Sequence, residues 1–184
     1  RVMTIMGYGK FGGKLLGTHT LMSVIQIFLY FLLFGVFESE IYQWLMGIFF
    51  ILLFWLVIYA DASYYGQNDL KRGTFNKVKG FISGLIASIP GTVVYIGAVV
   101  FEIFRTNEQS VNFMEIALRI WLIPYIKLYV TFENVMPYIM IVFILFFPIV
   151  SGLSYLDGIR RRDKILKAIE KREAMRSELS KRNS

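Results

Sequence analysis

Long apolar runs separated by short polar stretches dominate the chain, and the lengths of these runs predict its fold. A helix needs about 20 predominantly apolar residues to cross the hydrocarbon core of a bilayer. Four runs without charged residues come close to that length or exceed it: Thr20–Phe37, Ile41–Ala60, Phe81–Phe101 and Val135–Leu156. With their interfacial flanks they predict spans over about residues 18–37, 41–60, 81–104 and 135–156. The predicted fold class is an all-α membrane protein with four transmembrane helices.

A fifth stretch, residues 111–132, is long enough to cross a membrane but is interrupted by charges and a proline. It carries Glu115, Arg119 and Lys127, and it contains Pro124. Glu115 and Arg119 are one helical turn apart and can pair, which lowers the cost of shallow burial. We expect this amphipathic segment either to lie in the outer interface or to enter the membrane as a re-entrant pair of helices broken at Pro124.

Positive charges distinguish the two sides of the predicted bundle, because short loops rich in Lys and Arg stay on the cytoplasmic side. With four spans, seventeen of the twenty basic residues fall on one side, and Arg105, Arg119 and Lys127 fall on the other. A fifth span would move the ten bases of Arg160–Arg182 to the outer side and remove this asymmetry. The charge pattern therefore predicts a multi-pass protein of the cell membrane with four spans and both termini cytoplasmic.

Composition agrees with this class and excludes several kinds of chemistry. Hydrophobic residues make up 56% of the chain and aromatic residues 17%, gathered in blocks that soluble domains do not show. The absence of Cys excludes disulfides, thiolate zinc sites and iron–sulfur clusters. The single histidine, His19, is expected to be a polar anchor at the start of the first span. We expect no cofactor and no metal, and we expect the bases to face anionic lipid headgroups rather than nucleic acid.

The first predicted domain, residues 1–17, is rich in glycine and basic. Its stretch GYGKFGGK contains Gly7-x-Gly9-x-x-Gly12, which matches the dinucleotide-binding fingerprint in letters. That motif works only between a strand and a helix that receives the pyrophosphate, and here a membrane span follows. We expect the segment to lie on the inner leaflet, with Lys10 and Lys14 at the lipid phosphates.

The second and fourth spans, within the predicted 18–156 membrane domain, end in similar stretches. These are Ser63–Gly66, SYYG, and Ser154–Gly158, SYLDG, and basic residues follow both. Tyrosine is enriched at the headgroup level, so we expect both stretches to be interfacial exits on the cytoplasmic side. The alternative is a parallel internal repeat, in which two hairpins of the same orientation end alike.

Small residues recur at four-residue steps along the third predicted span. Such spacing lets helix backbones approach closely, and Pro90 is expected to kink the helix because it lacks a backbone N–H. The span is therefore either a packing core with a bend or a broken helix that lines a substrate path. The predicted packing residues are Gly80, Ser83, Gly84, Ala87, Ser88, Pro90 and Gly91.

Asp61 and Glu102 are the candidates for an ion or proton site, because ionisable groups in or beside spans commonly carry function in membrane proteins. Both stand near the end of a span, so each also has a structural interpretation. Asp61 can be solvated or can pair with Lys71 or Arg72, and Glu102 can pair with Arg105. The sequence places no two carboxylates together, so it supports no acid–base pair.

Residues 157–184 have the composition of a charged cytoplasmic helix. They combine good helix formers with ten basic residues and a weak apolar line. This helix either stays solvated near the membrane surface or docks on a partner. The residues expected to contact lipid or partner are Arg160, Arg161, Arg162, Ile165, Ile169, Met175 and Leu179.

Bulky spans, few acids and a charged tail favour a non-catalytic integral membrane subunit, or an assembly or regulatory factor, of a larger membrane protein complex. The expected partner is a larger membrane protein or further copies of this chain. The alternative is a small oligomeric transporter or channel that uses the kinked third helix with Asp61 and Glu102. We expect no enzyme, because the sequence supports no nucleophile–base pair and no metal constellation.

Overall fold

The computed structural model describes residues 5–34, 39–104, 111–132 and 136–182, and these residues fold entirely as helices and short connections. Four helices are long and apolar enough to cross a membrane, which confirms the predicted helical class with four candidate spans. The elements are α1 (Ile5–Phe34), α2 (Glu40–Lys71), α3 (Lys79–Phe104), α4 (Phe113–Trp121), the 3₁₀ helix η1 (Ile123–Tyr125), α5 (Ile126–Thr131) and α6 (Met136–Arg182).

The N-terminal glycine-rich segment differs from its expected form. From Ile5 onward it is the first part of α1, continuous with the first span, and not a separate segment. Phe11 and Leu15, one helical turn apart, are buried in the core. Gly12 lies so close to α3 that an added Cβ would stand 2.9 Å from the Ser83 carbonyl oxygen. Burial of one helical face thus outweighs the weak helix propensity of the glycines.

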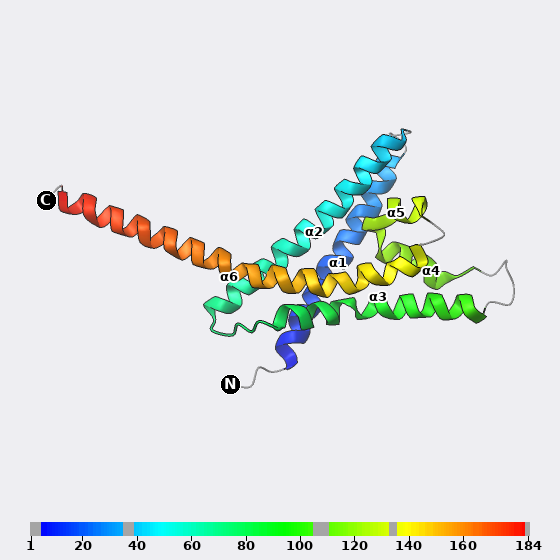
Figure 1. Ribbon diagram of the computed structural model, residues 1–184, viewed down its shortest axis with the longest axis horizontal. Helices are drawn as coiled ribbons and strands as arrows, with labels where there is room; N and C mark the ends of the chain where they lie inside the picture. Colours follow the sequence, from blue (N-terminus) through cyan, green and yellow to red (C-terminus); the bar gives the residue numbers. More distant parts are fainter. Residues whose placement is uncertain (1–4, 35–38, 105–110, 133–135, 183–184) are drawn as a thin grey trace.

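The four long helices form two antiparallel pairs that spread apart at one end (Figure 1). α1 and α2 make one pair, and α3 and α6 make the other, with α2 also packed on α6 and α1 on α3. α4, η1 and α5 lie between the two pairs at the end where they spread, in contact with α1, α2 and α3. α6 extends beyond the other helices as a single long helix that ends near the C-terminus.

The opposite end of the bundle, where α1 begins, α2 ends and α3 begins, is called the basic end below. Lys10, Lys14, Arg72 and Lys79 line one cleft there. One apolar cluster, which includes Phe11, Leu15, Ile58 and Tyr155, packs near this end. A second cluster, built around the tip of the α4–α5 segment, packs Leu118, Tyr125 and Tyr129 against Met140 and Ile144 of α6.

α3 contacts its neighbours through its small residues. Gly80, Ser83, Gly84, Ala87, Ser88 and Gly91 are all buried, and the helix continues through Pro90, which is half-buried. An added Cβ at Gly84 would lie 2.1 Å from the Ser151 Oγ and 2.7 Å from the Pro148 Cα of α6. At Gly91 it would lie 2.5 Å from the Trp121 Nε1 of α4. The small side chains therefore allow α6 to pack closely on one part of the helix and α4 on another.

Residues 111–132 fold as a helical hairpin whose turn lies at Leu122–Pro124. Asn112 caps α4: its side-chain oxygen accepts a hydrogen bond from the Glu115 N–H at 3.1 Å. Leu122, Ile123 and Pro124 are buried, so the turn is inserted among the long helices. Chain direction changes at Pro124 because proline cannot continue the backbone hydrogen bonds of α4.

Three polar side chains hold the two arms of this hairpin together. Arg119 pairs with Glu115 at 2.7 Å, and the Tyr129 hydroxyl donates a hydrogen bond to the same Glu115 oxygen. The Arg119 guanidinium also stands 4.1 Å from the centre of the Tyr129 ring. A tyrosine hydroxyl is protonated at neutral pH, so Tyr129 is the donor in its hydrogen bond to the Glu115 carboxylate.

Candidate functional site

The two similar stretches that end the second and fourth spans pack against each other at the basic end. An added Cβ at Gly66 would stand 2.1 Å from the Tyr155 carbonyl oxygen, and one at Gly158 would stand 2.4 Å from the Ser63 carbonyl oxygen. α2 and α6 thus cross with their backbones in contact, which only glycine allows on both sides. The two similar stretches therefore form the crossing of α2 and α6. Neither stretch predicts this crossing by itself.

Tyr155 is buried among the helices, whereas the sequence pattern predicts a side chain that faces lipid headgroups. Its side chain is completely buried, and its ring stacks on Phe75 with centroids 5.3 Å apart. Phe11 of α1 lies on another side of the ring, at 5.7 Å. Close contact of Gly80 with the Tyr155 Cβ explains the difference, because α3 covers the face that would otherwise meet the membrane surface.

A buried network of polar side chains, centred on Asp69, adjoins this crossing. Asp69 is 6% exposed, and its Oδ2 accepts hydrogen bonds from the Lys79 Nζ at 2.6 Å and from the Tyr155 hydroxyl at 2.7 Å. Thr74 bonds to the Asp69 carbonyl oxygen through its backbone N–H at 2.9 Å. The network ties the end of α2 to the start of α3 and to α6. Because a buried carboxylate is costly unless paired, these partners are a condition for the burial of Asp69.

The start of α1 is fixed to the same end of the bundle by hydrogen bonds. The Asn76 side-chain amide donates to the Tyr8 hydroxyl at 2.9 Å, and the Ser83 hydroxyl donates to the Tyr8 carbonyl oxygen at 3.1 Å. These bonds hold α1 in a defined position over α3. They leave the other side of α1, which carries Lys10 and Lys14, facing the end of α2.

Between these elements lies a polar cleft of about 1030 Å³. It runs between the first turns of α1, the last turns of α2 and the connection to α3. The Lys14 Nζ stands 4.8 Å from the centre of the Tyr65 ring, and Tyr65 itself stacks on Phe11 at 4.5 Å. Lys10 and Arg72 are exposed at the walls, while the Asp69–Lys79 pair forms part of the floor. This cleft combines space, positive charge and aromatic faces in one place.

The direction of α6 beyond the bundle is set by a second polar group at the basic end. The Tyr59 hydroxyl donates to the Asp157 Oδ2 at 2.5 Å, and Arg161 pairs with the same oxygen at 3.3 Å. The Arg161 guanidinium also stands 4.8 Å from the centre of the Tyr59 ring. These contacts bind α6 to α2 just before α6 leaves the other helices.

His19 lies within the bundle instead of anchoring α1 at a surface. It is 5% exposed, and its ring stacks on Trp121 with centroids 4.2 Å apart. The Phe54 and Phe147 rings stand at steep angles to it, with centroid distances of 5.1 and 5.6 Å. The imidazole therefore serves as a flat packing surface for the tip of the α4–α5 segment.

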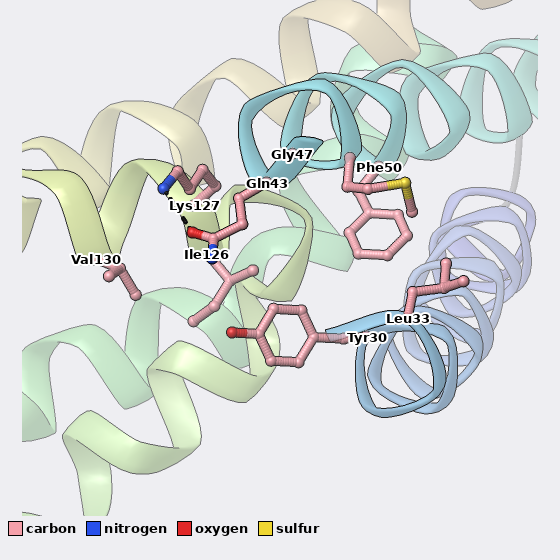
Figure 2. Close-up of a pocket in the computed structure, with 9 residues that line it drawn as sticks. Tyr30, Leu33, Gln43, Gly47, Phe50, Ile126, Lys127 and Val130 are labelled. Atoms are coloured by element: carbon pink, nitrogen blue, oxygen red, sulfur yellow. Dashed lines mark hydrogen bonds between the residues drawn. The ribbon is translucent and has the colours of Figure 1, made fainter. Parts of the chain in front are cut away.

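A separate, mostly apolar pocket of about 210 Å³ opens between α1, α2 and α5 (Figure 2). Tyr30 and Leu33 reach it from α1, and Gly47 lets α5 pack closely on α2, since an added Cβ would stand 2.7 Å from the Lys127 Cβ. At its edge the Lys127 Nζ donates a hydrogen bond to the Gln43 side-chain oxygen at 3.1 Å. The pocket can hold a small apolar group but brings no reactive side chains together.

The two carboxylates considered for an ion site lie far apart. The Asp61 Oδ2 accepts a hydrogen bond from the Thr18 hydroxyl at 2.8 Å. It stands ten residues before the end of α2, about 15 Å along the axis, whereas Glu102 is about 35 Å along α3 from its start. Glu102 is exposed, and its predicted partner Arg105 lies outside the described residues. The structure does not bring Asp61 and Glu102 into one site.

The residues predicted to meet lipid or a partner lie where α6 leaves the bundle and beyond. Arg160 and Arg161 are exposed and Arg162 is half-buried. Ile165, Ile169 and Met175 are exposed, and the side chain of Leu179 lies outside the part that the structure describes. From Asp163 to Glu173 every side chain is exposed.

Sequence reasoning gave no role in packing to Asp69, Lys79 and Tyr8, and it assigned Tyr155 to the interface. Asp69 and Lys79 appear in the sequence as ordinary loop charges ten residues apart. The available signal was the pair of glycines that end the two similar stretches, since helix backbones meet at small residues.

Comparison with protein-family models, with curated proteins and with solved structures gives no match for this chain. Within the described ranges, no group of three or more His, Asp or Glu residues is placed to hold a metal ion.

Proposed function

We propose that this chain is a non-catalytic integral membrane subunit, or an assembly or regulatory factor, that attaches to a larger membrane protein through the extension of α6. The observation that carries the proposal is the extension itself, residues 163–182. It continues a span without interruption and has exposed apolar side chains at Ile165, Ile169 and Met175. An exposed apolar line on a helix without neighbours is typical of a docking surface.

The attachment of α6 to the bundle supports this role. The Gly66–Gly158 crossing and the Asp157 contacts with Tyr59 and Arg161 hold α6 against α2. The extension is therefore presented in a fixed direction, and residues 163–182 reach about 30 Å from the bundle. Arg160–Arg182 carry ten bases and four acids, a net charge of +6, so the partner surface that fits is acidic around an apolar groove.

The orientation in the membrane belongs to the same proposal. The basic end collects Lys10, Lys14, Arg72 and Lys79, and this excess of bases favours the cytoplasmic side for that end. The extension of α6 then projects into the cytoplasm. The α4–α5 segment enters the membrane from the outer side as a re-entrant hairpin.

The test compares two double variants of the full-length protein. Ile165→Ser with Ile169→Ser removes the apolar line. Lys167→Ser with Glu170→Ser changes the opposite face and leaves the net charge unchanged, so it is the matched control. Each is isolated from native membranes in mild detergent, and stoichiometric partners are quantified by mass spectrometry.

We expect the first variant to insert normally and to lose its stoichiometric membrane protein partner, and the control to retain it. Removal of Lys164–Ser184, with Arg160–Arg162 kept, should have the same effect as the first variant. If the purified chain alone moves an ion or solute across liposomes, and Asp61→Asn or Glu102→Gln abolishes this, the subunit proposal is wrong and the transporter alternative replaces it.

A further inference from the structure

The cleft at the basic end has the chemistry of an anion site. Its walls carry Lys10, Lys14 and Arg72, and within the described residues none of the three pairs with a carboxylate. Asp69 in the floor is already neutralised by Lys79 at 2.6 Å. Four bases against one acid leave a charge of +3 around a cleft of about 1030 Å³. A ligand with more than one negative charge would balance this excess of positive charge.

The glycines of α1 add an independent observation. Glycine inside a helix costs about 1 kcal/mol relative to alanine. Gly12 is packed closely against α3, whereas Cβ atoms at Gly7, Gly9, Gly13 and Gly17 would meet nothing within 4 Å. Both Gly7 and Gly13 line the cleft. Glycine there leaves the backbone open to the close approach of a ligand.

The walls of the cleft are held in position before any ligand arrives. Tyr8 is bonded to Asn76 and Ser83, which fixes α1 over α3. Lys14 lies over the Tyr65 ring, which keeps its ammonium group at the cleft instead of free in solution. Arg72 follows directly on α2 and offers a planar guanidinium, the group best suited to paired phosphate oxygens.

We propose that this cleft binds a phosphate group, seated among Lys10, Lys14 and Arg72 and close to α1 at Gly13, where no side chain of α1 takes up the space. Basic pockets between membrane helices on the cytoplasmic side are suited to lipid headgroups, and a soluble phosphate offers the same chemistry. The site is separate from the α6 extension and does not depend on a partner protein.

The experiment uses the full-length protein in a nonionic detergent at fixed ionic strength. Isothermal titration calorimetry measures binding of short-chain phosphatidic acid, inorganic pyrophosphate and short-chain phosphatidylcholine. We expect saturable binding of at least one of the first two and no binding of the zwitterionic lipid. Binding of phosphatidic acid alone identifies a lipid headgroup, and binding of pyrophosphate identifies a soluble phosphate. If neither binds, the proposal is overturned.

Charge variants locate the site. Lys14→Gln and Lys10→Gln should each weaken binding by about fivefold, the effect of one base at a phosphate surface. Lys77→Gln is the matched control, because Lys77 is exposed at the same end but does not line the cleft. Thermal unfolding of each variant verifies that it is folded. Equal weakening by the cleft variants and by Lys77→Gln would show general attraction to the basic surface and would overturn the proposal.

A glycine pair tests the backbone contact. Gly13 and Gly17 are both exposed on α1 with open space at the Cβ position, but only Gly13 lines the cleft. Alanine at either position should leave the fold intact and slightly favour the helix. Gly13→Ala should weaken phosphate binding, and Gly17→Ala should leave it unchanged. Equal affinities of the two variants would refute the placement of the phosphate at Gly13.

Discussion

Asp69 shows how single residues determine the structure of the basic end. A carboxylate 6% exposed is stable there because Lys79 and Tyr155 both donate to its Oδ2. Lys79 begins α3 and Tyr155 lies within α6, so one acidic side chain joins three helices. Hydrogen bonds to a charged group are stronger than those between neutral groups, and loss of one leaves a buried lone pair unsatisfied.

Tyr155→Phe tests this contribution. The variant keeps the ring that stacks on Phe75 but removes the hydroxyl that bonds to Asp69, so we expect a loss of about 1–3 kcal/mol in the free energy of unfolding. Tyr64→Phe is the control, because the Tyr64 side chain is 58% exposed. Thermal unfolding in detergent measures both. The same midpoint for the two variants would contradict a structural role for the Tyr155 hydroxyl.

At the scale of elements, α3 is the helix around which the bundle is arranged. Its small residues pack against Tyr155 and Ser151 of α6. Its Ile86 contacts Gly12 of α1, and its Gly91 contacts Trp121 of α4. Without a hydrophobic driving force between helices in lipid, such close packing and the hydrogen bonds it permits hold them together. The Ser151 hydroxyl uses this proximity to donate to the Gly80 carbonyl oxygen at 3.2 Å.

Gly84→Leu should therefore disrupt the contact between α3 and α6. The added side chain would begin 2.1 Å from the Ser151 Oγ and 2.7 Å from backbone of α6, and overpacking of this kind costs about 1–3 kcal/mol or more. Val99→Leu, on an exposed part of the same helix, should be mild. The two are compared by thermal unfolding and by yield of monodisperse protein. Similar behaviour would mean that the small residues do not govern this contact.

At the scale of the whole molecule, the described bases lie in two unequal groups. Those at the start of α1, the end of α2, the start of α3 and in the extension of α6 lie toward the basic end. Arg119 and Lys127 belong to the α4–α5 segment, where the helix pairs spread apart. If a membrane lies across the four long helices between the two groups, the positive-inside rule predicts that the basic end is cytoplasmic.

Cysteine labelling in intact cells tests this orientation, since the chain has no cysteine of its own. We expect an impermeant maleimide to modify a Cys at position 107, in the predicted external loop, and to leave Ser180→Cys unmodified until the cells are permeabilised. Labelling of position 180 in intact cells would reverse the orientation. It would also exclude a cytoplasmic partner for the α6 extension.

Local properties of the sequence were sufficient for the class of the protein and for its four long helices. The length of an uninterrupted apolar run is a local property, and in a membrane the backbone must satisfy its hydrogen bonds within each helix. The four-residue spacing of small side chains on α3 and the break at Pro124 are local in the same sense. Each follows from the identity of residues within a few turns of helix.

Which helices pack against one another is not a local property of the sequence. Only the tertiary structure determined these neighbours. Whether Tyr155 meets lipid headgroups or a buried Asp69 depends on where α3 passes, and nothing near Tyr155 in the chain encodes that path. The same holds for Phe11 and Leu15, whose glycine-rich surroundings predict a separate interfacial segment, whereas α3 provides the surface that buries them. An apolar helix face can pack against many neighbours. A buried carboxylate that needs partners, and two glycines at a helix crossing, are compatible with few arrangements of the helices. The fold of the basic end therefore came from contacts between segments 60 or more residues apart, such as Tyr8 with Asn76 and Asp69 with Tyr155.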